Sequence, residues 1–216
     1  MFLGIIALLD DEETDRCLRG NGKTCTLTYL LYKYKLKGYR VWTNYYTSFS
    51  DEVIGFQEMI NKLNAIYKKN EELKKEKKPI INYKIVLGVT ELQEIINSVG
   101  SSTDQVLFVD SFTSQIRKLD VDCLYDTQVL KHLHKRVRRH TERILIPIKY
   151  HTDGKECNYD RCKKDHLIFI HSYKPFKKYP VKVIKDWKVG KMYDSFQRVE
   201  DKIIIEKINK KGVKNG

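Results

Sequence analysis

The sequence predicts a three-layer α/β fold with a mainly parallel central sheet. Short apolar runs of strand length alternate with longer amphipathic segments, an order typical of a sheet that carries helices on both faces. With 216 residues, of which 41% are hydrophobic, the chain is long enough to bury a core and too apolar to be disordered. We therefore expect one domain over residues 1–216.

The expected elements begin with a continuous apolar run at residues 2–9, which suits a buried parallel strand. Apolar residues at helical spacing follow it, and Gly38 marks where that helix stops. The elements expected next are a helix at 23–34, a strand at 39–46, a helix at 51–67, a charged connector or solvated helix end at 68–78, and a strand at 83–89.

The second half of the chain continues the alternation, although residues 185–199 show no clear period. The elements expected there are helices at 92–98 and 104–118, a strand at 122–127, a basic helix at 129–140, strands at 143–150 and 166–173 with a polar Cys/His loop at 151–166 between them, and an edge strand at 202–207 within the tail 202–216.

The chain is strongly basic, with 41 Lys and Arg against 28 Asp and Glu and a formal charge of +13. Such an excess favours anionic partners, of which nucleic acid is the commonest. A lysine-rich solvated surface is the alternative explanation. Five cysteines without repeated spacing argue against a secreted disulfide scaffold, and no apolar run approaches the roughly 20 residues of a membrane helix. We expect a soluble, intracellular protein without an integral membrane segment.

A glycine-rich turn stands between the first strand and the first helix and has the composition of a phosphate-binding P-loop, or Walker A motif. Small residues let successive backbone N–H groups surround a phosphate, while a lysine reaches the β and γ oxygens and a threonine holds Mg²⁺. The expected nucleotide-binding residues are Gly20, Asn21, Gly22, Lys23, Thr24 and Cys25. ATP is then the expected substrate, with Mg²⁺ as its cofactor, held by Thr24.

The motif departs from the usual pattern at its start. The first glycine of the standard P-loop falls on Cys17, and the link from the first strand is several residues longer than normal. That link holds an acidic insert at residues 10–15, which would serve as a lid, a subunit contact or simply a solvated loop.

Hydrolysis also needs a carboxylate at the end of a neighbouring strand, and two segments compete for this role. Residues 106–110 end in Asp110 after four apolar residues, but the surrounding sequence also fits one continuous helix. Residues 85–91 form a cleaner strand that ends in Glu91, with Thr90 where an aspartate usually contacts the magnesium shell. Thr90 would then act on Mg²⁺ through a water.

The order of motifs along the chain resembles the FtsK/HerA-type P-loop ATPases. Within that superfamily it looks most like the viral genome-packaging branch of archaeal turreted icosahedral viruses, and also like the zonula occludens toxin-like proteins. The segments that carry the resemblance are residues 20–24, 43–44, 90–93, 115–118, 127–128, 135–139 and 190–194. The resemblance spans most of the chain and implies a RecA-like fold.

The resemblance also favours Glu91 over Asp110, because only Glu91 keeps the motif order intact. It implies that Glu91 polarises water, that Gln128 senses the γ-phosphate, and that Arg117 acts in trans on a neighbour's nucleotide. A residue acting in trans implies a homo-oligomeric ring, a pentamer or hexamer by resemblance. Alternatively, Arg117 is an ordinary helix-end cation and Gln128 a helix cap.

The implied activity is an ATP-driven translocation of double-stranded DNA into a viral capsid, docked at its portal vertex. We accordingly expect the protein in the host cytoplasm and on the virion. The alternatives are another DNA translocase or helicase of the superfamily, or a nucleotide-dependent assembly or secretion switch. The expected DNA contacts are the basic residues Lys135, Arg136, Arg138 and Arg139. This helix would otherwise neutralise the acidic insert of a neighbouring subunit.

The loop at 151–166 contains two histidines and two cysteines, residue types that suit zinc. The residues are His151, Cys157, Cys162 and His166. Their spacing matches no common zinc module, so the sequence favours cysteines that are inert or oxidised to a disulfide, with a structural zinc as the alternative.

Overall fold

The computed structural model describes residues 1–8, 21–98, 102–129, 133–157, 162–174 and 177–198. Ten strands lie in this part of the chain: β1 (Phe2–Leu8), β2 (Arg40–Thr43), β3 (Tyr45–Thr47), β4 (Glu52–Val53), β5 (Ile85–Val89), β6 (Asp122–Val129), β7 (Arg143–His151), β8 (His166–Lys174), β9 (Lys177–Lys185) and β10 (Tyr193–Arg198). The helices of the described residues are α1 (Lys23–Leu36), α2 (Phe56–Lys75), α3 (Leu92–Ser98), α4 (Ser102–Lys118), α5 (Lys135–His140), α6 (Asp186–Val189) and the 3₁₀ turn η2 (Gly190–Met192).

Eight of the strands form one sheet in the order β4-β2-β5-β6-β1-β7-β8-β9. The six strands from β4 to β7 are parallel, whereas β8 and β9 run antiparallel to their neighbours. The strands β3 and β10 pair separately as an antiparallel ribbon. The parallel strand β6 lies between β1 and β5, so the carboxyl ends of all three strands meet at one edge of the sheet.

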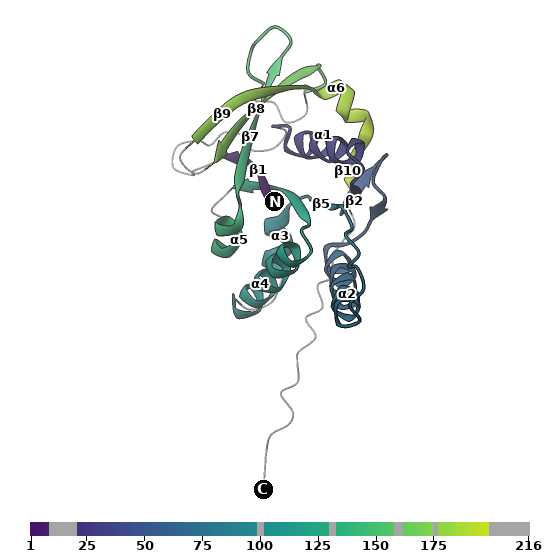
Figure 1. Ribbon diagram of the computed structural model, residues 1–216. Coiled ribbons are helices and arrows are strands. Elements are labelled where there is room, and N and C mark those ends of the chain that lie inside the picture. Colours follow the sequence, from purple (N-terminus) through teal and green to yellow (C-terminus); the bar gives the residue numbers. More distant parts are fainter. Residues whose placement is uncertain (9–20, 99–101, 130–132, 158–161, 175–176, 199–216) are drawn as a thin grey trace.

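Helices cover both faces of the sheet, which gives the predicted three layers. In Figure 1, α1 and α6 lie on one face, and α2, α3, α4 and α5 lie on the other. The sheet has a hydrophobic core on each face, and successive side chains of β1 point into one core and then the other. Phe2 packs under α2 and α4, whereas Leu3 and Ile5 pack under α1. The predicted fold class, a three-layer α/β fold with a mainly parallel sheet, is confirmed.

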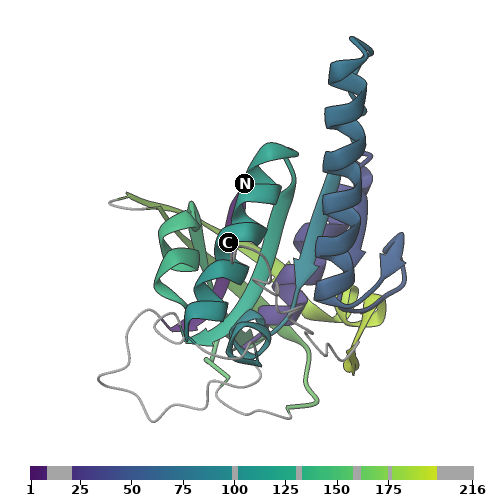
Figure 2. The same ribbon diagram turned by 90° about the horizontal axis from the view of Figure 1, so that it is seen from below.

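Two predictions in the first half need correction. The strand expected at 39–46 divides at Asn44 into β2 and β3, which belong to different sheets. The helix expected at 51–67 begins only at Phe56, because Glu52 and Val53 pair with β2 as β4. That helix, α2, then continues to Lys75, so most of the charged segment 68–78 is a solvated helix end that projects past the sheet (Figure 2).

The second half also differs from the prediction at its basic segment and at its end. Of the helix expected at 129–140, the described residues contain α5, Lys135–His140, whereas Val129 belongs to β6. Residues 186–198, which showed no periodicity, form α6, η2 and β10. The edge strand at 202–207 and the tail 202–216 lie outside the described residues. No helix in the described part of the chain has both the length and the apolar character needed to cross a bilayer.

Candidate nucleotide site

The described part of the P-loop begins at Asn21 and leads directly into α1. Gly22 caps the helix in the left-handed conformation, with φ at 85°, and its carbonyl accepts the first helical bond, from the Thr26 N–H at 2.9 Å. A Cβ atom at this position would lie 2.6 Å from Cδ1 of Ile168 on β8, so backbone and surroundings both require glycine. Gly20, Cys17 and the acidic insert at 10–15 lie outside the described residues.

Three of the predicted nucleotide-binding residues form the first turn of α1, whose free N–H groups carry partial positive charge. Lys23 is 7% exposed, and the Thr24 hydroxyl donates to Oδ2 of Asp126 at 3.1 Å. Cys25 points into the core, where burial raises the pKa of its thiol to about 12, with the charge of Asp186 as a second cause. Its side chain therefore serves packing, and only its backbone N–H can face a phosphate.

Asp126, near the end of β6, was missed in the sequence. It is 1% exposed, and its two oxygens accept hydrogen bonds from the Thr24 hydroxyl and, at 2.7 Å, from the Glu91 N–H. The pKa of this carboxyl is raised to about 6, mainly because the group is buried. The negative charge of Glu91 also raises the pKa, and its effect is larger than the opposite effect of the nearby Lys23. The only local signal in the sequence is a carboxylate inside a strand, where buried charges need a partner.

Glu91 follows β5 and turns toward the same place. Its backbone is left-handed, with φ at 52°, a conformation that is uncommon for a non-glycine residue and is held here by the bond to Asp126. Its Oε2 accepts a hydrogen bond from the Gln93 side chain. Glu91 is half-buried, so its carboxylate is held in place but remains open to solvent.

Thr90, for which the sequence predicts a water-mediated contact with Mg²⁺, is bound to Asn44. Its N–H and hydroxyl both donate to Oδ1 of Asn44, at 2.8 and 3.3 Å, and its carbonyl accepts from the Asn44 amide at 3.2 Å. Asn44 thus fixes the end of β5 from the end of β2. The magnesium role assigned to Thr90 stays a prediction, and Asp126 is the carboxylate that contacts Thr24.

Gln128 lies two residues after Asp126 on β6, so both side chains leave the same face of the strand. It is half-buried at the carboxyl edge of the sheet. The structure therefore brings Lys23, Thr24, Glu91 and Asp126 together, with Gln128 two residues further along the strand that carries Asp126.

Arg117 lies at the other edge of the sheet. It is exposed at the end of α4 and lines a cleft of about 490 Å³ together with Met1, Arg139 and His140. The amino group of Met1 bonds Asp122, the first residue of β6, six positions before Gln128. At about 3.3 Å per residue this separation is roughly 20 Å. Arg117 therefore cannot reach the phosphate site of its own chain.

The basic residues of α5 are exposed around one buried residue, Val137. Arg136 forms an ion pair with Asp110, whereas Lys135, Arg138 and Arg139 face solvent. Asp110 itself lies on α4, in agreement with the helix that the surrounding sequence also fits.

Comparisons with known proteins give matches in structure but not in sequence: no family model and no curated protein matches the chain. The pCW3 conjugation coupling protein TcpA, solved in a monomer form with ATPγS, matches with a TM-score of 0.50 and 10% identity over 85% of this chain and 60% of that one. The N-terminal domain of zonular occludens toxin from Neisseria meningitidis gives 0.46 and 17% over 89% and 98%. The DNA-packaging ATPase B204 of Sulfolobus turreted icosahedral virus gives 0.45 and 13% over 85% and 96%.

The chain has the fold of the RecA-like P-loop NTPases. The predicted resemblance to FtsK/HerA-type ATPases is confirmed at the level of the fold. The chain spans 60% of the coupling protein and 39% of the EssC structure from Geobacillus thermodenitrificans.

Proposed function

We propose that this protein binds ATP with Mg²⁺ and hydrolyses it. The observation that carries the proposal is the contact of the Thr24 hydroxyl with Asp126, whose other oxygen holds the backbone of Glu91. This contact places a hydroxyl and two carboxyl groups beside Lys23, at the amino terminus of α1. Hard oxygen ligands beside a phosphate-binding turn fit Mg²⁺, and a lysine at the start of a helix fits the phosphates.

Each residue then has a definite role. Lys23 and the N–H groups of the first turn bind the β- and γ-phosphates, and Thr24 and Asp126 hold the metal. Bound Mg²⁺ supplies charge neutralisation at the phosphate oxygens. Glu91, half-buried beside Asp126, orients and polarises the attacking water, and Gln128 monitors the γ-phosphate from the end of β6. Asp126 thus takes the position that Thr90 holds in the sequence-based assignment.

We further propose that the hydrolysis drives movement of double-stranded DNA, with genome packaging into a viral capsid as the specific process. Support comes from the order of the sequence motifs, the net charge of +13 and the exposed Lys135, Arg138 and Arg139. Backbone phosphates are the expected contact, because such side chains bind without reading sequence. The host cytoplasm and the virion are then the places of action, with the portal vertex of the capsid as docking partner.

A ring of five or six copies belongs to the same proposal. Arg117 lines a cleft with Met1 beside the start of β6, whereas the phosphate site lies at the other end of that strand, roughly 20 Å away. This position is consistent with action on a neighbouring subunit. A guanidinium delivered to the γ-phosphate from outside stabilises the charge that spreads over the transferred group. The second candidate, a nucleotide-dependent assembly or secretion switch, would be favoured if Thr90 rather than Asp126 stood at the metal, because the Thr90 hydroxyl provides no charge for it.

The test is the steady-state ATPase rate of the full chain, with and without double-stranded DNA. We expect Glu91→Gln and Asp126→Asn each to lower turnover by about 10²-fold or more, since both remove a group that acts on the water or the metal. Glu72→Gln, a matched change of an exposed residue on α2, should leave the rate unchanged.

Full turnover in both site variants would refute the assignment of the site. A wild-type rate that rises with DNA supports the motor, and charge removal at Arg138 and Arg139 should then weaken the stimulation and reduce its salt dependence. A wild-type rate that ignores DNA would contradict the motor and favour the switch.

A further inference from the structure

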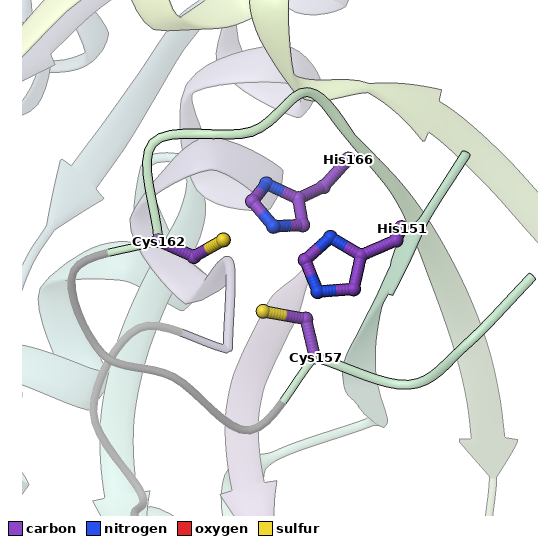
Figure 3. Close-up of side chains that lie close together, drawn as sticks. All are labelled: His151, Cys157, Cys162 and His166. Carbon is purple, nitrogen blue, oxygen red and sulfur yellow. The ribbon is translucent and has the colours of Figure 1, made fainter. Parts of the chain in front are cut away.

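The loop between β7 and β8 gathers four metal-ligating side chains in one place. His151 ends β7 and His166 begins β8, and the two residues are directly paired across the strands. One ligand atom from each of His151, Cys157, Cys162 and His166 lies within 4.8 Å of the others. In Figure 3 both sulfur atoms and both imidazole rings point toward a common space.

The chain conformation explains how distant residues reach this space. After His151 the chain turns tightly through Gly154, whose φ is 85°, and the His151 N–H donates to the Lys155 carbonyl at 2.8 Å. The returning segment bonds again at Cys157, whose N–H donates to the Lys149 carbonyl at 2.8 Å. These backbone bonds hold Cys157 against the end of β7 beside the two histidines.

Two buried nitrogen atoms at this site have no hydrogen-bond partner. They are Nδ1 of His151 and Nε2 of His166, and the whole His166 residue is only 2% exposed. A buried polar atom left unpaired is costly, so such atoms call for an explanation. A bound cation would satisfy both atoms.

His166 is also oriented as metal ligands usually are. Its Nδ1 lies 2.9 Å from Oδ2 of Asp186, while the other oxygen of Asp186 accepts the His166 backbone N–H at 2.9 Å. A carboxylate on one ring nitrogen fixes the tautomer in which the other nitrogen presents a lone pair, an arrangement found repeatedly behind zinc-bound histidines. Here that other nitrogen is the unpaired Nε2.

We propose that His151, Cys157, Cys162 and His166 bind one structural zinc ion. Two thiolates and two imidazoles are a common tetrahedral zinc donor set, and four protein ligands leave no open position for catalysis. With Zn–S near 2.3 Å and Zn–N near 2.1 Å, neighbouring donors of a tetrahedron lie roughly 3.3–3.8 Å apart. The four ligand atoms now lie within 4.8 Å of one another, so movements of about 1 Å would bring them to these distances. Both thiols lose their protons to solvent on binding.

The ion would join the end of the β7–β8 hairpin to the phosphate-binding side of the sheet. Asp186 begins α6, and Val189 at the other end of α6 shares a core with Cys25 of α1. Two residues beyond His166, Ile168 packs against Gly22 of the P-loop. The site is thus a structural clamp next to the nucleotide site, and it does not depend on the proposed hydrolysis.

Elemental analysis of the purified full chain tests the proposal, with one equivalent of zinc per chain as the expected result. Cys157→Ser and Cys162→Ser should lose the metal, whereas Cys123→Ala, a buried cysteine in the core of the opposite face, should keep it. Because a cysteine variant can lose metal by failing to fold, circular dichroism accompanies each measurement. Asp186→Asn keeps all four ligands and should weaken zinc affinity about 10–100-fold.

Cobalt substitution of the wild-type protein gives an independent readout. A tetrahedral site with two thiolates should produce intense visible d–d bands and a thiolate charge-transfer band, both lost in Cys162→Ser. The denatured, chelated protein should contain all five thiols. A protein without zinc that lacks these cobalt bands would overturn the proposal, as would three thiols, which indicate a Cys157–Cys162 disulfide.

Discussion

Replacing Asp126 with asparagine should make the ligand-free protein more stable at neutral pH, although it removes a group that we assign to the metal. The wild-type carboxyl is buried, and its pKa is raised from 3.8 to about 6. At a pH between these two pKa values, the Asp126 carboxyl is ionised in the unfolded chain and protonated in the native protein. Unfolding therefore releases a proton, and the stability of the native state falls as the pH rises through this window.

The size of the effect follows from the two pKa values. A difference between 3.8 and about 6 corresponds to about 3 kcal/mol of native-state stability, lost between pH 4 and pH 6.5. Asparagine has nearly the same shape as aspartate but no charge, so the variant protein should not lose this stability as the pH rises. The bonds from the Thr24 hydroxyl and the Glu91 N–H can be kept by the amide oxygen, with less strength than by a carboxylate.

Urea unfolding of both proteins from pH 4 to pH 7.5, without nucleotide or divalent metal, measures the difference directly. We expect the stability of the variant minus that of the wild type to grow by about 3 kcal/mol across the window, whatever its value at pH 4. Groups that titrate equally in both proteins cancel in this difference. A difference that stays flat would refute the raised pKa of Asp126. A difference that decreases with pH would show that Lys23 and the hydrogen bonds from Thr24 and Glu91 outweigh burial and lower the pKa.

Two further substitutions test the backbone around the site. Gly22→Ala forces a left-handed alanine against Ile168, and should cost at least about 2 kcal/mol in urea unfolding and abolish nucleotide binding in a fluorescent-analogue titration. The cost of Gly22→Ala should be smaller when it is measured in an Ile168→Ala background, although that background is itself less stable than the wild type. Unchanged binding in the single variant would contradict the P-loop geometry. Asn44→Ala leaves the buried N–H and carbonyl of Thr90 unpaired, so it should lower the free energy of unfolding in urea by about 2–3 kcal/mol. The control Asn61→Ala changes an exposed residue and should lower it by less than about 0.5 kcal/mol. Equal effects of the two substitutions would show that Asn44 does not hold β5.

Much of the fold could be predicted because the parallel core strands are buried on both faces. Every residue of β5 is buried, so its sequence is a continuous apolar run that no surface element imitates. The errors fall on peripheral elements instead. The two residues of β4 and the ribbon strand β10 carry too little apolar pattern to be recognised, and backbone pairing alone defines them.

The part of the candidate site in the turn before α1 was predictable, because its glycine, lysine and threonine are consecutive in the sequence. Asp126 was not, because its importance depends on the register of β6 between β1 and β5. That register pairs Ile5 with Asp126, and Val89 of β5 with Tyr125, so the carboxylate arrives beside Thr24 only in the assembled sheet. No spacing within the chain expresses this contact between residues 102 positions apart.

The raised pKa of Asp126 also fits the role that we propose for it. Burial and the nearby charge of Glu91 both make the ionised form of this carboxyl unfavourable in the ligand-free protein. A divalent cation at Thr24 would favour the ionised form, so metal binding and loss of the proton are coupled. Stability that the protein gives up in its ligand-free form is then recovered when the nucleotide and its metal bind. A buried acid beside a P-loop threonine is therefore better explained by its ligand than by the fold alone.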